Sequence, residues 1–497
     1  MLTGLRTGHA RHAAVAPNAN LDAPPAVGTA SGMDRTQDEG CGMPRNMRFT
    51  LFLVLIIALG VGVRIAYVLS IGRHVVLGLD AIGYELLGKG LAHGRGYSNP
   101  AAFFAYGVER ATANFPPGYP LFLAGFDKLG ASSTTGMELV GACVGAFTVG
   151  ATGLLGRRVS GRSSVGLISA LLVAVSPTLI ASAGSSMSET LSVPLMVVVL
   201  CAVSWAARSA SWVPWVVVGG LAGLLALVRS EDLVVALLLV PVAVVAAPGH
   251  SWRHRVALVS VVLISTGAVI SPWLVRDYTT FHPPVLVSTA AEKTLAGANC
   301  RSTYYGSLIG YWDFSCLGHN DLANSNEARY GLVLSEEGRA YLKTHLSRVP
   351  IVLAVRALRS WGLYDPAQGA QLARFETRSV GWQQFAWPVS LLTLILAIPG
   401  IVGIRRRRLA LVLIAGPAVV DTLVVLATYG NDRFVLSAIP SLCIGAAATL
   451  VWLGNWLTRN LHGPARIIEG EDVKVGFADT DQVPGGARLR NDRAADA

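Results

Sequence analysis

Long apolar runs separated by short polar connections dominate the chain. Ten of these runs approach the length of about 20 residues that a helix needs to cross the hydrocarbon core of a bilayer. The pattern therefore predicts an all-α polytopic membrane protein with about ten transmembrane helices. The predicted spans are residues 49–70, 136–155, 164–183, 189–207, 212–228, 232–247, 255–275, 386–404, 409–428 and 434–457.

Two long segments on one side of the predicted bundle do not cross the membrane. The first outer loop, residues 71–135, contains two short helical stretches, 80–92 and 119–130, which we expect to be juxtamembrane helices. The large outer loop, residues 276–385, precedes the eighth span, and its stretch 349–361 has the pattern of an amphipathic helix. Loops of this length are uncommon unless they fold or carry a function.

Composition supports a membrane protein and argues against a soluble one. Hydrophobic residues make up 52% of the 497 residues and charged residues only 14%, whereas charged residues are about 25% of soluble domains. The formal net charge of +10 indicates arginine-rich cytoplasmic loops that are attracted to anionic lipid, rather than a nucleic-acid partner.

The placement of arginine predicts the orientation of the chain. Every second connection is rich in arginine, whereas the connections between them also carry acidic residues. The arginine-rich set comprises Arg157, Arg158, Arg162, Arg208, Arg253, Arg255, Arg405 to Arg408 and Arg459. The positive-inside rule assigns this set, and both termini, to the cytoplasm. We therefore predict a multi-pass protein of the plasma (inner) membrane whose two long loops face outward.

The two ends of the chain have no apolar period. Residues 1–46 and residues 465–497 are polar, and we predict that both are disordered cytoplasmic tails. The transmembrane domain then extends over residues 47–464.

One pair of cysteines shares a polar loop. Cys300 and Cys316 lie in the large outer loop, whereas Cys143, Cys201 and Cys443 fall within apolar runs. If the loop faces an oxidising compartment, Cys300 and Cys316 are candidates for a disulfide. The alternative is two unpaired thiols.

The first outer loop begins with a carboxylate on an apolar helix face. At about 100° per residue, a helix beginning near residue 80 places Asp80, Tyr84, Leu87 and Leu91 on one side. An ionisable group at the end of an apolar stripe along the membrane is costly, so Asp80 is a functional candidate. The alternative is that Asp80 is only the N-cap of this helix.

Further short motifs occur on the predicted outer side. With the residues around Asp80 they form the series Gly78-Leu79-Asp80, Tyr84, Gly94-Arg95-Gly96-Tyr97, Pro116-Pro117-Gly118-Tyr119-Pro120, Pro272-Trp273-Leu274-Val275-Arg276-Asp277-Tyr278 and Tyr429-Gly430-Asn431-Asp432-Arg433-Phe434. In this order the series resembles the GT-C glycosyltransferases, specifically the bacterial branch related to protein mannosyltransferases and lipid A aminoarabinose transferase. The resemblance covers residues 49–278 and, more weakly, the last spans.

The resemblance implies an inverting glycosyltransferase that moves a sugar from a polyprenyl-phosphate donor to a glycan, lipid or protein acceptor of the cell envelope. Asp80 matches the acidic residue of the family's first loop and would be the catalytic general base. The lipid phosphate needs cationic partners, for which Arg229, Arg276, Arg433 and Lys293 are candidates. The alternative for each is a side chain that reaches toward the interface for solvation alone.

Two more residues complete the predicted substrate-binding set, namely Tyr84 and Glu189. The motifs require no cofactor, but a divalent cation held by Asp80 and Glu189 is an open alternative. Some relatives carry two adjacent acidic residues where this chain has Asp80 followed by Ala81, which weakens the case for a metal. Glu189 is also explained as a carboxylate that the helix dipole favours at an N-terminus.

Two other functions fit part of the pattern. A transporter or flippase of a lipid-linked sugar is the main alternative, because Asp421 lies in the middle of a span. Transporters often contain internal repeats, and no repeat is evident here. A non-catalytic scaffold of an envelope complex is the third hypothesis, in which Asp80 would be dispensable. Neither the sugar nor the acceptor follows from the residues.

Overall fold

The computed structural model describes residues 44–318 and 326–461. Within these ranges every regular element is helical, apart from one isolated bridge between Ser98 and Ala111. The all-α polytopic fold predicted from the apolar runs is therefore confirmed. The predicted tails, except for residues 44–46, lie outside the described residues, so their disorder stays a prediction.

Each of the ten predicted spans is helical in the structure. The helices that contain them are α1 (Arg45–Ser70), α5 (Thr134–Ser160), α6 (Ser163–Val175), α7 (Pro177–Ala183), α8 (Glu189–Ala206), α9 (Val213–Val228), α10 (Val240–Ala246), α11 (Trp252–Thr280), α17 (Val380–Ile404), α18 (Arg408–Ala427) and α19 (Ile439–Leu461). Seven helical segments of the described chain are long and apolar enough to cross a membrane, and a bent pair would make an eighth.

The described part of the structure has fewer membrane-crossing helices than the ten predicted spans. At three of these spans the difference has a local cause. The predicted span 164–183 consists of α6 and α7, which are bent by 59° relative to each other at the proline that begins α7. The predicted span 212–228 is α9, which has only 16 residues. The predicted span 232–247 is divided into the 3-10 turn η2 (Ser230–Asp232), the π-helical segment η3 (Val235–Leu239) and α10.

Short helices form the two outer loops. They are α2 (Leu79–Ala92), α3 (Pro100–Tyr106), α4 (Gly118–Lys128), α12 (Ala290–Ala298), α13 (Arg301–Tyr305), α14 (Glu327–Thr344), α15 (Val349–Ser360) and α16 (Pro366–Leu372), with 3-10 turns η1 (Gly72–His74), η4 (Phe314–Leu317), η5 (Leu346–Arg348), η6 (Ala373–Glu376) and η7 (Asp432–Ala438). The predicted helices 80–92, 119–130 and 349–361 correspond to α2, α4 and α15.

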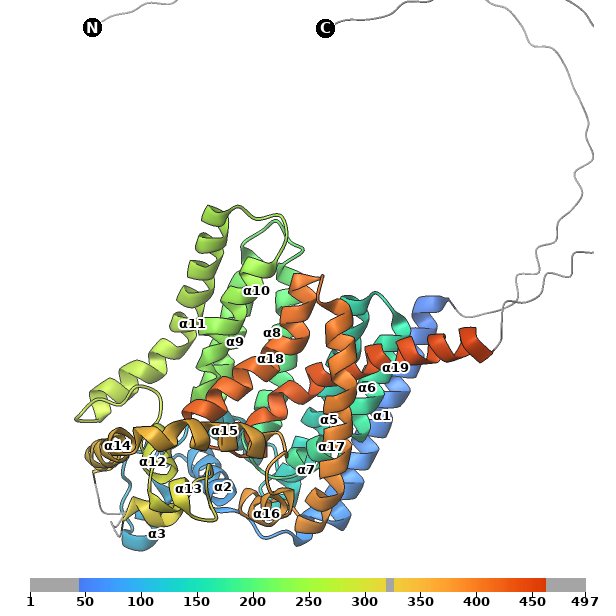
Figure 1. Cartoon of the computed structure of the whole chain (residues 1–497). Helices are drawn as coiled ribbons and strands as arrows, with labels where there is room; N and C mark the ends of the chain where they lie inside the picture. Colours follow the sequence, from blue (N-terminus) through green and yellow to red (C-terminus); the bar gives the residue numbers. More distant parts are fainter. Residues whose placement is uncertain (1–43, 319–325, 462–497) are drawn as a thin grey trace, which may run out of the picture. The chain divides into compact units, whose positions relative to one another are not determined.

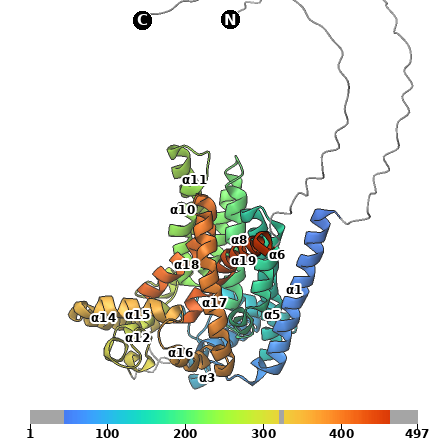
Figure 2. The same ribbon diagram turned by 45° about the vertical axis from the view of Figure 1, so that its right-hand side comes forward.

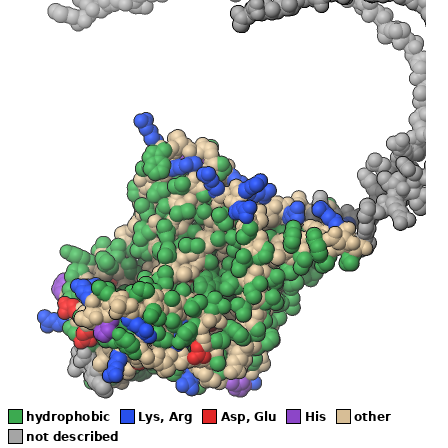
Figure 3. Space-filling model, viewed as in Figure 1, with side chains coloured by type: hydrophobic (Ala, Val, Ile, Leu, Met, Phe, Trp, Pro, Cys, Tyr) green, Lys and Arg blue, Asp and Glu red, His purple; other side chains and the backbone are tan. Residues whose placement is uncertain are grey.

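The arginine-rich connections and the outer loops lie at opposite ends of the helical bundle. Figure 1 shows the outer-loop helices α2, α3 and α12 to α16 at its lower end, and the connections α5–α6, α10–α11 and α17–α18 at its upper end. On the face shown in Figure 3, lysine and arginine side chains follow the upper edge, whereas acidic side chains are visible only near the lower end. This arrangement matches the division of the loops into two sides that the arginine pattern predicted.

Helix α15 has an apolar outer face and buried charges. Ile351 and Leu358 are exposed, whereas Arg356 and Arg359 are buried and donate hydrogen bonds to backbone carbonyl groups. One of these carbonyls, that of Leu426, lies at the end of α18. The helix runs across the direction of α17 in both views (Figures 1 and 2). Arg356 therefore joins the large outer loop to the end of α18, and Arg359 joins two parts of that loop.

Candidate functional site

Asp80 is the second residue of α2 rather than its N-cap. The helix begins at Leu79, and its N-cap is Gly78, which forms no side-chain capping bond. The Gly78 N–H donates to the hydroxyl of Thr377 at 2.9 Å, and a Cβ atom at Gly78 would overlap the carbonyl oxygen of Phe375. The large outer loop is thus packed directly against the N-cap residue of α2, and the Asp80 carboxylate is not used for capping.

Arg433, at the start of the segment before α19, joins carboxylates from three parts of the chain. Its Nη1 atom lies 3.1 Å from Asp80 Oδ2 and 2.5 Å from Glu376 Oε2, and its Nε atom lies 3.7 Å from Glu189 Oε1. The side chain of Asp80 is 42% exposed, whereas those of Arg433 and Glu189 are 16% and 4% exposed. Asp80 is therefore the accessible end of a mostly buried charge network.

Arg229 lies on the buried side of this network. It forms an ion pair with Glu189 and donates from Nε and Nη2 to one oxygen of Glu231, at 3.0 and 2.7 Å. The guanidinium groups of Arg229 and Arg433 both lie over the ring of Phe434. Arg229 is buried and pairs with two carboxylates. In the structure it therefore stabilises the buried charge of Glu189.

Further polar contacts join the end of the large outer loop to the segment before α19. Asn431 donates to Glu376 Oε1 at 2.9 Å, and Arg378 forms a bidentate pair with Asp432 at 3.0 and 2.8 Å. Burial raises the pKa of Glu376, and the adjacent Arg433 opposes that rise. Glu376 and Arg378 were not predicted from the sequence, because no local motif marks a charged residue whose partners lie more than 50 positions away in the chain.

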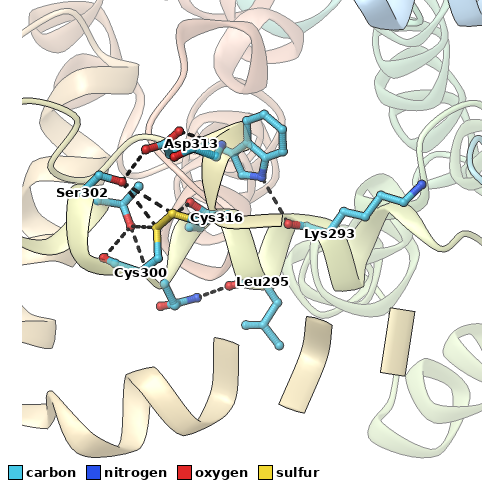
Figure 4. Close-up of a disulfide and its surroundings, with 12 residues drawn as sticks. Lys293, Leu295, Cys300, Ser302, Asp313 and Cys316 are labelled. Carbon is cyan, nitrogen blue, oxygen red and sulfur yellow. Dashed lines mark hydrogen bonds between the residues drawn. A yellow bond between two sulfur atoms is a disulfide. The ribbon is translucent and has the colours of Figure 1, made fainter. Parts of the chain in front are cut away.

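Lys293 approaches the site from α12. Its Nζ atom donates to Asn114 Oδ1 at 2.5 Å, and Figure 4 shows its side chain extending away from the disulfide of the same loop. Burial lowers the pKa of Lys293, and the carboxylates of Glu327 and Asp80 act in the opposite direction. Lys293 therefore links α12 to the first outer loop through Asn114.

The two loop cysteines are joined in the structure. Cys300 and Cys316 form a disulfide (Figure 4) that closes the segment between α12 and η4. Within this segment Trp312 donates from its indole N–H to the carbonyl of Lys293 at 3.2 Å. A Cβ atom on Gly297 would overlap the same indole ring, so the closed loop packs tightly against α12 and supports the backbone that carries Lys293.

Arg276 and Tyr84 occupy packed positions instead of open ones. Arg276 donates to the carbonyls of Thr112 and Tyr97, at 2.8 and 3.1 Å, and contacts Asp277 at 2.6 Å. These bonds fasten the first outer loop to the end of α11. Tyr84 is buried.

The Tyr84 ring packs between Phe115 and Tyr119, with ring centroids 4.1 and 5.0 Å away. The predicted roles of Tyr84 and Arg276 in substrate binding stay predictions.

Asp421 has a partner within the bundle. Both of its carboxylate oxygens accept from the hydroxyl of Ser437 at 2.8 Å. Asp421, Asp232, Arg229 and Arg433 line a cavity about the size of one water molecule beneath the charge network. The mid-span charge that suggested transport is thus hydrogen-bonded locally.

The carboxylates of the site do not form a metal-binding set. Among the described residues, no group of three or more His, Cys, Asp or Glu side chains is arranged to hold a metal ion. The two residues for which a cation was considered, Asp80 and Glu189, are bridged by the guanidinium of Arg433. A cation between them would have to displace this group, so the residues present do not fit the metal alternative.

Comparison with known proteins supports the resemblance seen in the motifs. Residues 114–275 match the dolichyl-phosphate-mannose-protein mannosyltransferase family. The matched region includes Glu189 and Arg229 and stops short of Asp80 and Arg433. No curated protein gives a significant sequence match over the chain.

One solved structure shares the fold at low sequence identity. The archaeal oligosaccharyltransferase AglB from Archaeoglobus fulgidus, in complex with an inhibitory peptide and a dolichol-phosphate, superposes with a TM-score of 0.52 at 15% identity, over 85% of this chain and 52% of AglB. The chain thus spans about half the length of that protein. ArnT from Cupriavidus metallidurans, bound to undecaprenyl phosphate, gives a TM-score of 0.39 at 13% identity, over 82% of this chain and 78% of ArnT. The family match and the fold shared with AglB confirm that this chain resembles the GT-C membrane glycosyltransferases, as its outer-side motifs predicted.

Proposed function

We propose that the protein is a membrane glycosyltransferase that moves a sugar from a polyprenyl-phosphate donor to a cell-envelope acceptor at the outer face of the membrane. The observation that supports this most is the half-exposed carboxylate of Asp80, which pairs with Arg433 at the accessible end of the charge network. A base must be accessible to its substrate, and the other carboxylates that pair with Arg433 are buried. The lipid phosphates bound to the solved relatives AglB and ArnT are consistent with a donor of this class.

The proposed reaction is a single displacement. The acceptor hydroxyl oxygen forms a bond to the anomeric carbon while the bond from that carbon to the donor phosphate oxygen breaks. Asp80 takes the hydroxyl proton as general base, and the bonding electron pair leaves with the polyprenyl phosphate. One displacement inverts the anomeric centre. Lys293, and Arg433 from its edge of the site, stabilise the negative charge that the leaving phosphate gains.

Orientation is part of the same proposal. The arginine-rich connections would face the cytoplasm, with both termini on that side of the plasma membrane, and Asp80 would then open to the outside. The Cys300–Cys316 disulfide supports this, because disulfides persist in oxidising compartments.

The decisive experiment compares sugar transfer by wild-type and Asp80→Asn protein in membranes supplied with a labelled polyprenyl-phosphate sugar. We expect the variant to lose activity by about 10²–10⁴-fold, the usual contribution of a general base, at similar protein abundance. Glu336→Gln, which alters an exposed acid on α14, is the matched control and should retain full activity. Unchanged transfer by Asp80→Asn would disprove the proposed base. An absence of transfer combined with movement of the intact lipid-linked sugar across vesicles would identify a transporter instead.

A further inference from the structure

A cavity lies beside the charge network, and its lining includes Asn431 and Asp432, which directly precede Arg433 in the chain. It is bounded by α17, by α16 and the end of α15, and by the start of α19, and its empty volume, including the open mouth, is about 1120 Å³. This volume includes solvent at the mouth, so the cavity is a groove that is open on one side and can hold part of an elongated molecule.

The cavity follows the outer part of α17. Residues of this helix from Gln383 to Leu394 line it, which corresponds to about 16 Å along the helix axis at 1.5 Å per residue. Trp361, Trp387 and Leu442 form much of the remaining wall. The wall is mostly apolar, with Ser390 and Thr393 among the lining residues of α17, and a mostly apolar groove of this length suits a hydrocarbon chain.

The end of the cavity near the charge network is polar. Asp432 lines this end, its side chain is 41% exposed, and it is held by Arg378 and by Gln383, the latter at 3.4 Å. Asn431 lines the same end and donates to Glu376, which pairs with Arg433. Two interactions thus connect the polar end of the cavity to the arginine that orients Asp80.

The charges at this end favour a neutral head group over a phosphate. Arg359 is the single basic residue among the described residues that line the cavity, and its Nε and Nη2 atoms already donate to the carbonyls of Ile309 and Ser307. Arg378 is buried and occupied by both oxygens of Asp432. A phosphate here would face the Asp432 carboxylate with only the buried Arg359 guanidinium to offset the repulsion, whereas a hydroxyl group can donate to Asp432.

We propose that this cavity binds a lipid with a neutral, hydroxyl-bearing head group, with its hydrocarbon chains along α17 and its head at Asp432. The identity of this lipid as the sugar acceptor rests on the proposed function; the binding itself does not. The phosphate-linked donor then uses the separate, lysine-containing side of the site near Asp80.

The test measures binding of radiolabelled dioleoylglycerol to the purified full chain in detergent, with dioleoyl phosphatidic acid as a competitor that has the same chains. Ala386→Trp fills the cavity, because Ala386 is buried and lines it. Thr393→Leu adds less volume at a second lining position. Leu392→Trp introduces the same indole on the lipid-facing side of α17, where Leu392 is exposed and outside the cavity lining, and is the matched control.

We expect saturable binding of dioleoylglycerol by wild type and Leu392→Trp, at least tenfold weaker binding by Ala386→Trp, and a smaller loss for Thr393→Leu. A tenfold excess of phosphatidic acid should displace little of the bound dioleoylglycerol. The proposal would be overturned if Ala386→Trp and Thr393→Leu both bound dioleoylglycerol as tightly as wild type does. Full displacement of the bound dioleoylglycerol by phosphatidic acid would also overturn it. Asp80→Asn should bind the lipid normally, so loss of transfer in that variant and loss of lipid binding in Ala386→Trp report separately on the two proposals.

Discussion

The Nη1 atom of Arg433 lies 3.1 Å from an oxygen of Asp80, although 353 positions separate the two residues in the chain. The contact links the first outer loop to the segment that leads into the last helix. The same Nη1 atom also pairs with the buried carboxylate of Glu376, and the Nε atom faces that of Glu189. One arginine therefore stabilises two buried acids and orients an accessible one, and these two tasks can be separated by mutation.

Removal of Arg433 should damage both stability and activity, whereas removal of the Asp80 charge should damage activity alone. Arg433→Met leaves Glu189 and Glu376 with less compensation, and breaking a buried pair typically costs about 3–5 kcal/mol. Asp80→Asn retains an oxygen that accepts from Arg433, and an exposed pair is worth at most about 1 kcal/mol. Thermal unfolding in detergent, read by intrinsic fluorescence, should rank wild type and Asp80→Asn together, well above Arg433→Met.

Arg433→Lys serves as the control for charge. An ammonium group keeps the positive charge but lacks the planar fork of donors that reaches several carboxylates at once, so an intermediate unfolding temperature is expected. If Arg433→Met and Asp80→Asn unfolded at the same temperature, the supporting role of Arg433 would be refuted.

The affinity for the donor should fall with rising pH because of Lys293. Burial lowers the pKa of this amine, so it loses its positive charge at a lower pH than an exposed lysine does. The cationic form binds phosphate and exists below the pKa; the KM for the donor should therefore rise as the pH passes upward through that value, with less change in kcat. Lys293→Arg should remove this rise, because arginine stays charged throughout.

Lys343→Arg, at an exposed position of α14, should leave the pH profile of wild type unchanged. A KM that rose with pH equally in the Lys293→Arg variant would show that another group is responsible.

How much of the fold and of the site could be predicted from the sequence depended on how far apart the interacting residues lie in the chain. The spans follow from the local requirement for about 20 apolar residues, and Asp80 and Arg433 stand out individually as charges at the ends of apolar runs. The pairing of Asp80 with Arg433 cannot be predicted from the sequence. The role of Glu376, which is 57 positions from Arg433, cannot be predicted either. Periodicity also predicted α15, but it did not reveal that its arginines point inward, because their acceptors are carbonyls of distant segments.

Arg64 should be essential for the bend between α6 and α7. It is buried and donates to the carbonyls of Val173 and Ala174, at 3.1 and 3.2 Å. In a continuous helix the Val173 carbonyl would accept from residue 177, which is a proline without an N–H. Arg64→Met should therefore destabilise the fold by about 1–3 kcal/mol for each carbonyl left without a donor, measured by thermal unfolding in detergent.

A second substitution tests this explanation directly. Pro177→Ala restores an N–H at the position that Val173 lacks, so it should recover part of the stability lost in Arg64→Met. Pro399→Ala, in the separate helix α17, should give no recovery in the same background. Equal effects of the two alanine substitutions would argue against the carbonyl mechanism.

Thiol labelling in intact cells should place the large outer loop outside the cytoplasm. Cys300 and Cys316 are joined to each other, and the other described cysteines, Cys143, Cys201 and Cys443, lie within α5, α8 and α19. In a Cys41→Ser background, a membrane-impermeant maleimide should label the protein only after treatment with an impermeant reductant, and without lysis. A further Cys300→Ser/Cys316→Ser change should abolish this labelling. Labelling that required lysis would reverse the proposed orientation and place Asp80, with the charge network it belongs to, on the cytoplasmic side.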